Sequence, residues 1–215
     1  MIKDKYYIKS IDYKTAMAMV VSKHYLHRKS PCSYAFGFFE TETNKMIGVI
    51  TYGKPASPPL CKGICGIEES KSVMELTRLY IDDCTPKNTE SWFIGQTIKR
   101  VKEEIIVSFA DTSAHHLGTI YQATNFIYTG LSDKHVLWEY IGMGNVHARH
   151  WAKEYGGVNA AKLALGDDLI RKERPRKHRY IYFNGSKKRK KELKEKLKYI
   201  IQPYPKREVI KNVDI

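Results

Sequence analysis

The sequence predicts a mixed α/β (α+β) fold, in which helices flank one mixed sheet and a basic extension follows at the C-terminus. Short apolar or alternating runs, separated by helical patterns, carry the first part of this prediction. A concentration of Lys and Arg late in the chain carries the second part. The chain has 215 residues, of which 42% are hydrophobic, so it is long enough to form one well-packed domain.

The first quarter of the chain predicts a strand, a helix and a hairpin. We expect a strand at residues 6–11 and a helix at 13–25, where apolar residues recur at helical spacing. Strands at 34–40 and 45–52 flank a polar tetrapeptide and should form a hairpin. The prolines and glycines of residues 54–70 predict an irregular surface loop near the functional site.

The middle of the chain predicts a strand, a helix and a second strand. Apolar strands are expected at residues 73–81 and 105–110. Between them, a helix should begin at Asn88 or Ser91 and end near Glu104. Because a helical crossover joins the two strands, they should pair in parallel.

A polar turn at residues 111–118 follows the second of these strands. We expect a helix next, at about residues 119–128, with Thr119 as its cap and Gly130 as its stop. The remaining expected elements are a strand at 135–141, a helix at 158–165, a strand at 179–183 and a Lys-rich helix at 186–201.

This order of strands and helices is that of the GNAT acyltransferase fold. We therefore expect residues 1–185 to form a GNAT-like catalytic domain, within which residues 143–175 are an insertion or an irregular segment. Residues 186–215 should form a basic C-terminal helix and tail.

The charge of the chain favours a polyanionic partner. Its net charge is +14, and residues 171–198 alone hold fourteen Lys and Arg against three Glu, a net +11. Such a local field attracts nucleic acid, and double-stranded DNA is the expected partner. A solubilising tail or a basic helix on a membrane surface is the alternative. The residues expected to contact DNA phosphates are Arg28, Lys54, Lys187, Lys188, Arg189, Lys190 and Lys191.

No apolar run approaches the roughly 18 residues that span a bilayer, and the N-terminus has no apolar signal region. We therefore expect a cytoplasmic protein without a membrane partner. The four cysteines are too few and too irregularly spaced for a disulfide framework, and structural zinc is only weakly indicated. Reduced thiols are expected at Cys32, Cys61, Cys65 and Cys84.

The polar turn at residues 111–118 is the first candidate for a functional site, because open α/β sheets bind ligands where strand ends face helix starts. Asp111 ends the strand and Tyr121 lies in the first turn of the expected helix, so the two side chains can converge. His115 and His116 are alternative metal ligands or acid–base groups, or simply turn residues.

Five motifs carry a more specific resemblance: HYLHR at 24–28, GVITYGKPAS at 48–57, ELTRL at 75–79, ADT at 110–112 and YQATNF at 121–126. Together they resemble the Mom family of bacteriophage DNA-modification proteins. The resemblance covers roughly residues 23–138, and beyond residue 142 only the basic character is similar.

The resemblance implies a GNAT-like enzyme that converts N6 of adenine in DNA to a methylcarbamoyl-type adduct. This modification would protect phage DNA from restriction in the cytoplasm of an infected bacterium. Two other functions stay open. One is a conventional GNAT N-acyltransferase acting on a protein or small-molecule amine, and the other is a nucleic-acid-binding module with a catalytically dead fold.

The resemblance also implies bound iron, with His24, Tyr25, Asp111 and Tyr121 as catalytic and metal-binding residues. Imidazole, carboxylate and phenolate groups suit iron. Neighbours on a regular helix diverge by about 100°, so His24 and Tyr25 can share one ion only where the helix frays. In the alternative interpretation, the two tyrosines are packing residues and His24 caps a helix.

The fold suggests acetyl-CoA or another carbon donor, held at the helix start by Ser91, Trp92 and Gly95. Residues 84–96 lack the Gly-rich phosphate pattern of GNAT enzymes, and Glu90 would repel a phosphate, which favours an unusual donor. Reaching N6 inside a duplex requires extrusion of the base onto aromatic side chains. The aromatic residues available for this, or for the core, are Tyr34, Phe36, Tyr52, Trp92 and Trp138.

Overall fold

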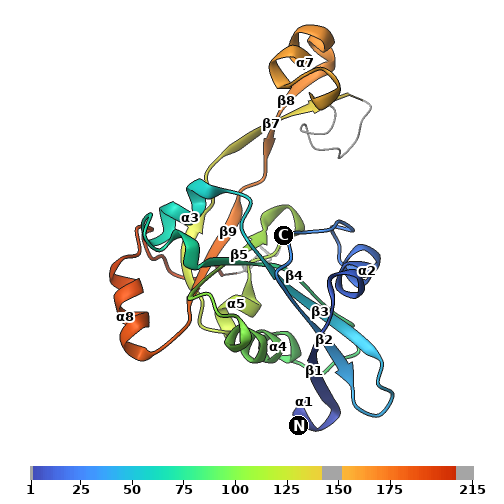
Figure 1. Cartoon of the computed structure of the whole chain (residues 1–215), viewed down its shortest axis with the longest axis vertical. Helices are drawn as coiled ribbons and strands as arrows, with labels where there is room; N and C mark the ends of the chain where they lie inside the picture. The colour runs from blue at the N-terminus through green and yellow to red at the C-terminus, as the bar shows by residue number, and fades with distance from the viewer. Residues whose placement is uncertain (1, 142–151, 207–215) are drawn as a thin grey trace, which may run out of the picture.

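The computed structural model describes residues 2–141 and 152–206 (Figure 1). Its main feature is a seven-stranded sheet in the order β1-β2-β3-β4-β5-β9-β6, beside a separate two-stranded sheet of β7 and β8. The main strands are β1 (Tyr6–Ser10), β2 (Tyr34–Glu40), β3 (Met46–Gly53), β4 (Val73–Ile81), β5 (Ile105–Asp111), β6 (Ile127–Leu131) and β9 (Lys177–Phe183). The sheet is mixed, because β4 and β5 pair in parallel while its other pairs are antiparallel. The predicted fold class and the predicted parallel pair are confirmed.

Helices cover both faces of the main sheet. They are α1 (Ile2–Lys5), α2 (Tyr13–Lys23), α3 (Pro58–Cys65), α4 (Thr89–Thr97), α5 (Thr119–Ala123) and α8 (Lys187–Glu195). On one face α3 and α8 pack against β5 and β9, as the buried Ile64, Leu193 and Val107 mark. On the other face α4 and α5 bury Phe93 and Tyr121 in the largest core cluster.

The strands β4 and β5 diverge along their length. They pair only from Val73↔Ile105 to Glu75↔Val107. Beyond this point β5 keeps its pairing with β9, up to Asp111↔Lys177, but no longer pairs with β4. The sheet is therefore open between the C-terminal ends of β4 and β5, which is where a ligand can enter.

The expected helix at residues 119–128 is wrong in its second half. The helix α5 ends at Ala123, because Asn125 takes a left-handed conformation with φ of 61°, and the chain continues as strand β6. Its N-cap is Gly118 rather than Thr119, with φ of 71°. The predicted length of α8 is also wrong, since this helix ends at Glu195.

The expected irregular loop at residues 54–70 contains helix α3. The hydroxyl of Ser57 accepts a hydrogen bond from the Leu60 N–H, and prolines occupy the first helical positions. Proline suits these positions because their N–H groups have no partner in a helix. The helix expected after Asn88 is α4, which ends at Thr97 and continues as a single 3-10 turn.

The expected insertion forms an arm that projects from the body (Figure 1). The arm consists of β7 (His135–Tyr140), α7 (Val158–Leu165) and β8 (Leu169–Arg174), with its own core that includes Ala161, Leu169 and Trp138. The helix at 158–165 is confirmed, whereas β8 was not expected. The strand at β7 is confirmed too, but its partner is β8 and not the main sheet. The rest of the insertion prediction, residues 143–151, lies outside the described residues.

Among the described residues, the structure contains no helix with the length and apolarity needed to cross a membrane.

Candidate functional site

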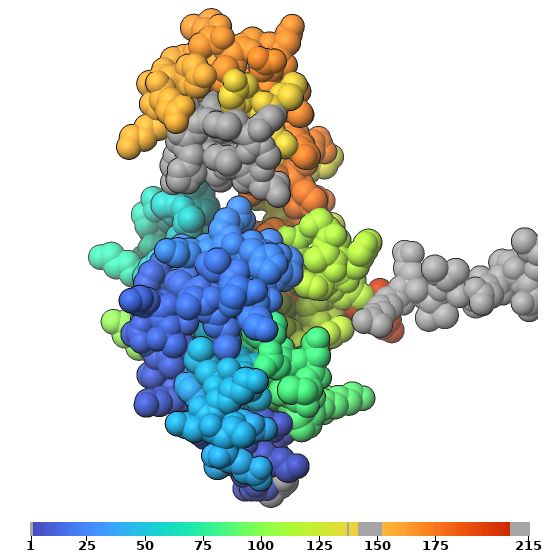
Figure 2. Space-filling view, turned by 90° about the vertical axis from the view of Figure 1, so that its right-hand side faces the viewer, coloured from blue at the N-terminus to red at the C-terminus, as the bar shows by residue number. Residues whose placement is uncertain are grey.

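A cavity of about 340 Å³ opens where β4 and β5 diverge. It is enclosed by the turn after α2, the middle of β4, the end of β5 and the segment leading into α5. Figure 2 shows these parts from outside, with the N-terminal segment around α2 beside the segment around α5, and the arm above them. The polar residues that line the cavity include His24, Tyr25, Glu75, Arg78, His116, Tyr121 and Lys177.

A β-bulge in β4 brings Glu75 and Arg78 to this cavity together. In the pairing with β3, Arg78 faces Thr51 and Leu76 faces Tyr52, so Thr77 is the extra residue. Without the extra residue, side chains three positions apart would point to opposite faces of the sheet. The bulge is therefore the local feature that places a carboxylate and a guanidinium on one side of the opening.

Glu75 is the cavity residue that is best suited to proton transfer. Burial raises the pKa of its carboxyl group to about 7, although the positive charges of Arg78 and Lys177 oppose the shift. A carboxyl group with this pKa changes protonation near neutral pH, as a general base requires. Glu75 belongs to the ELTRL motif, but the motif alone assigns it no role, because neither its burial nor the bulge is visible in the sequence.

Tyr121 forms the inner wall of the cavity as a neutral phenol. Burial raises its pKa to about 12, although the nearby Ser108 side chain opposes this shift. The turn before α5 approaches Tyr180 so closely that a Cβ atom on Gly118 would lie 2.4 Å from the Tyr180 ring. Only glycine fits there, and this close packing holds Tyr121 in place.

His24 and Tyr25 form a stacked pair at the outer side of the cavity. The chain leaves α2 at His24, the C-cap of that helix, so the two rings are not held on a helix and can stack with 4.5 Å between their centroids. Burial and the charge of Arg78 lower the pKa of His24 to about 4, so its imidazole is neutral. Tyr25 as a whole residue is 49% exposed, and its ring contacts the His116 ring edge-on.

Asp111 lies beside the cavity rather than in its wall. One carboxylate oxygen accepts hydrogen bonds from the Ser113 N–H and hydroxyl groups, and the other pairs with the Lys177 ammonium at 3.3 Å. Burial alone would raise the pKa of Asp111, but Ser113 and Lys177 together bring it below its ordinary value. The structure thus gathers His24, Tyr25, Asp111 and Tyr121 around one opening.

The expected iron does not fit these four groups. Nδ1 of His24 already accepts a hydrogen bond from the Leu26 N–H, which leaves the ring proton on Nε2. The pKa values of both tyrosines are raised, chiefly by burial, so the phenols are protonated, and both oxygens of Asp111 have partners. Within residues 2–141 and 152–206, no group of three or more His, Cys, Asp or Glu side chains could hold a metal ion.

The expected donor-binding residues lie on α4, and none of them lines the cavity. The Ser91 hydroxyl donates to the Asn88 carbonyl within the first turn, and Trp92 packs edge-on against Phe38 in the core. A Cβ atom on Gly95 would meet nothing within 4 Å. Their role in binding a carbon donor stays a prediction.

The aromatic residues expected to stack on a base also lie elsewhere. Phe36 and Tyr52 belong to the largest core cluster, and Tyr34 and Trp92 pack against it. Trp138 belongs to the core of the arm. Tyr25, expected as a metal ligand, is instead a partly exposed aromatic residue that lines the cavity.

Several of the expected DNA-binding cations have partners within the protein, and those of Lys54 and Arg189 are the closest. The Lys54 ammonium donates to the carbonyl oxygens of Lys71 and Val73. The Arg189 guanidinium binds the carboxylates of Glu69 and Glu104, which fixes α8 to the body. The residues of the expected set that are exposed are Arg28, Lys54, Lys187, Lys188 and Lys191.

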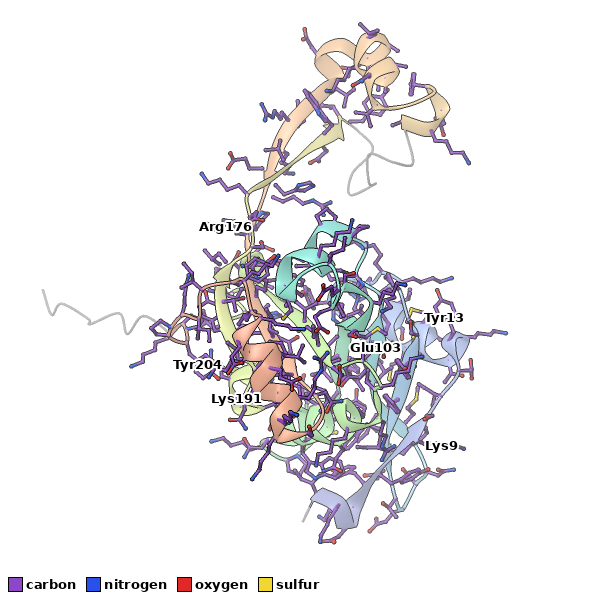
Figure 3. All side chains as sticks on the ribbon, turned by 60° about the vertical axis from the view of Figure 1, so that its left-hand side comes forward. Lys9, Tyr13, Glu103, Arg176, Lys191 and Tyr204 are labelled. Atoms are coloured by element: carbon purple, nitrogen blue, oxygen red, sulfur yellow. The ribbon has the colours of Figure 1, made fainter. Side chains whose placement is uncertain are left out.

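The basic C-terminal segment divides into two parts that lie at opposite ends of β5. Lys177 pairs with Asp111 at the end that borders the cavity. The helix α8 is attached to Glu104, immediately before the first residue of β5. A strand of this length spans roughly 20 Å. Figure 3 shows the two parts separately, with Arg176 at the neck of the arm and Lys191 on α8.

Replacing Arg189 with Ala is expected to destabilise the protein by about 2–4 kcal/mol, because Glu69 would lose its main partner while remaining 9% exposed. For a chain of this size each kcal/mol lowers Tm by about 2–4 °C, which thermal unfolding measures. Lys191→Ala is the matched control, since the Lys191 side chain is 81% exposed. Equal Tm values for the two variants would contradict the anchoring role of Arg189.

Comparison with known proteins gives a clear relationship over nearly the whole chain. A sequence model described as the Mom protein family matches residues 5–206. The chain is 28% identical over 205 residues to a protein named methylcarbamoylase mom from Escherichia phage Mu, covering 93% of this chain and 83% of that protein.

Solved structures give a more distant likeness. One is a ribosomal-protein-S5-alanine acetyltransferase from Vibrio fischeri, with 12% identity, a TM-score of 0.47, and coverage of 85% of this chain and 94% of that one. Another is a spermidine/spermine N-acetyltransferase from Vibrio cholerae, with 7% identity, a TM-score of 0.46, and coverage of 85% and 95%. The activities of these enzymes say nothing about this chain.

Proposed function

Since this chain belongs to the Mom protein family, we propose that it is a DNA-modifying enzyme that converts N6 of adenine to a methylcarbamoyl-type adduct. The observation that carries the proposal is the cavity between β4 and β5, where a carboxyl group that titrates near neutral pH faces a buried phenol. The name of the phage Mu relative, methylcarbamoylase, supports the type of group transferred.

The cavity suits a single extruded base. Its volume of about 340 Å³ lies at the lower end of the roughly 300–1,000 Å³ that small-molecule sites occupy. A base inside a duplex is out of reach of such a cavity, so the target nucleotide must leave the stack. The Tyr25 ring, backed by His24, offers a partly exposed aromatic face for the extruded adenine.

The proposed reaction is an acyl transfer. N6 of adenine attacks the carbonyl carbon of an activated methylcarbamoyl donor, a C–N bond forms, and the bond between that carbon and the donor's leaving group breaks. N6 loses one proton, which the ionised Glu75 accepts as general base. The Tyr121 hydroxyl and the Arg78 guanidinium are placed to stabilise the negative charge that develops on the carbonyl oxygen.

The remaining residues of the site have supporting roles in this proposal. Asp111 holds Lys177 at the cavity wall and fixes the turn that follows β5 through Ser113. The donor is an activated methylcarbamoyl compound, because the acetyl group of acetyl-CoA lacks the nitrogen of the adduct, and α4 with Ser91, Trp92 and Gly95 is its proposed binding element. No step passes through iron, since the residues do not fit it. The adduct would protect phage DNA from restriction in the host.

Restriction digestion tests this proposal. Plasmid DNA from cells that make the protein should resist endonucleases whose sites contain adenine, because the adduct places a bulky group in the major groove. Endonucleases with sites of only G and C should cut this plasmid and a control plasmid with an interrupted gene equally well. Equal cleavage at the adenine-containing sites, with folded protein present, would reject the proposal and favour an N-acyltransferase that acts on a protein or small-molecule amine.

A further inference from the structure

The arm of β7, β8 and α7 is built as a stable projection beside the cavity. At its neck, the Arg176 guanidinium donates to the carbonyl oxygens of Leu131 and Ser132, and Thr112 donates to the Arg176 carbonyl. These bonds tie both strands of the arm to the end of β5 that borders the cavity. Figure 3 shows Arg176 at this neck, between the arm and the body.

The strands β7 and β8 form a two-stranded ribbon. One face of this ribbon packs in the core of the arm, and the other face does not. Trp138, Tyr140 and Leu169 share one face and form the core with α7. The opposite face presents Ile170, Lys172 and Arg174, which alternate along β8, together with Glu139 of β7, whose carboxylate pairs with the Lys172 ammonium at 2.9 Å. The three β8 residues are exposed, and Ile170 retains 43% of its accessible surface.

The exposed face of the ribbon is continuous with the rim of the cavity. Arg174 is close enough to Arg28 and Asp111 for their charges to act on it. Arg28 itself lies at the rim, where its carbonyl oxygen accepts a hydrogen bond from Arg78. A surface hollow of about 350 Å³ at the neck is lined by three cations, Lys134, Arg174 and Arg176, and by the carboxylate residue Glu173. Basic residues therefore outnumber acidic ones from the rim to the neck of the arm.

We propose that the arm lies in the major groove of duplex DNA beside the target adenine, with the Ile170, Lys172 and Arg174 face toward the DNA. This inference rests on the proposed function, in which DNA is the substrate. The major groove, about 12 Å wide, admits a two-stranded ribbon. Six residue pairs give the ribbon a length of roughly 20 Å, enough to follow the groove over several base pairs.

The geometry of the reaction favours the same groove. N6 of adenine lies in the major groove of the duplex, so the cavity and the arm would approach from one side. Lys172 and Arg174 can bind phosphates or guanine edges, and Ile170 can contact the methyl group of thymine. The arm would then orient the duplex and contribute to the choice of adenine. The cations of α8 lie at the opposite end of β5, so they would contact only phosphates away from the DNA that the arm contacts.

An arm-shortened variant tests this inference. Residues 137–172 are replaced by Asn-Gly, which closes a tight hairpin between the paired Val136 and Glu173. The three core clusters of the body contain no residue of this segment, so we expect the body to keep its Tm. A second variant, Ile170→Ser with Lys172→Gln, keeps the whole arm. Lys188→Gln with Lys191→Gln on α8 is the matched control.

The first readout is the affinity for mixed-sequence duplex and single-stranded oligonucleotides at several salt concentrations. The arm-shortened variant should bind duplex at least about tenfold more weakly, with a log–log salt slope reduced by about 1, because the phosphate contact of Lys172 is lost while Arg174 remains. Its affinity for single strands should stay within about twofold, since the rim is unchanged. Unchanged duplex affinity and slope would overturn the inference.

The second readout is the distribution of adducts over plasmid adenines. The Ile170 and Lys172 variant should modify adenines with a weaker dependence on neighbouring bases, whereas the α8 control should lower modification evenly at all sites. A distribution identical to that of the wild type would overturn the role of the arm while leaving the proposed function intact. Absence of adducts with the wild-type protein would instead reject the proposed function.

Discussion

Replacement of Glu75 by Gln is expected to lower adenine modification by about 10²–10⁴-fold, the range that a positioned general base contributes. Gln has nearly the same shape as Glu but cannot accept the proton that leaves N6. The measurement is the fraction of modified deoxyadenosine in cells that make wild-type or variant protein at equal levels. A variant that retains more than about a tenth of the wild-type modification would contradict the assignment of Glu75.

The pH dependence of Tm for the same variant distinguishes a loss of activity from a loss of folding. Burial raises the pKa of Glu75 from 4.5 to about 7. Between these values the folded protein keeps the proton and the unfolded chain has released it, so stability falls as pH rises through this window. The Gln variant lacks this penalty. Its Tm relative to the wild type should therefore rise between pH 5 and pH 8.

Replacement of Asp111 by Ala is expected to lower adenine modification by about 10²-fold, while the affinity for duplex DNA stays within about twofold of the wild-type value. The loss would free Lys177 at the cavity wall and release the turn that Ser113 fixes. Both changes misplace groups around the substrate without touching the exposed arm. Adduct density and duplex affinity, measured on the same preparation, check this prediction.

Two further variants make the Asp111 prediction specific. Asp111→Asn keeps an oxygen that can accept from Ser113 but loses the ion pair with Lys177, so it should retain more activity than Ala and less than the wild type. Asp133→Ala removes an exposed carboxylate near the neck and should leave modification unchanged. Full activity of Asp111→Ala would contradict the role of Asp111 in holding Lys177 and the turn after β5.

Local sequence patterns were sufficient for most of the main sheet. The apolar runs at β2 and β4 have the predicted bounds, and the crossover between β4 and β5 correctly predicted their parallel pairing. The β8 strand was missed because its sequence, LIRKER, is mostly charged. Such a strand is stable in an exposed arm, where only Leu169 needs to be buried.

Conformations that depend on single backbone angles could not be predicted. The run that follows Thr119 has a helical pattern, but the left-handed Asn125 ends the helix early and makes room for β6. Pro58 and Pro59 predicted a loop because proline breaks helix interiors, yet both occupy the start of α3, where proline is favoured.

The candidate site was predictable only in part. The motifs pointed to His24, Tyr25, Asp111 and Tyr121, and the structure gathers these residues around one opening, although their roles stay proposals. Glu75 and Arg78 were quoted within a motif but given no function, because the β4 bulge that unites them depends on pairing with β3. The sequence shows correctly that Lys and Arg are concentrated late in the chain. It could not show that β9 separates this basic segment into two parts, which lie at opposite ends of β5.

Mass spectrometry of nucleosides from cells that make the wild-type protein examines the proposed reaction at its product. We expect a deoxyadenosine species that is heavier by one methylcarbamoyl group in place of one hydrogen atom, with the other three deoxynucleosides unchanged. The species should be nearly absent when Glu75→Gln replaces the wild type. DNA with only ordinary deoxyadenosine, in cells that contain folded wild-type protein, would contradict the account.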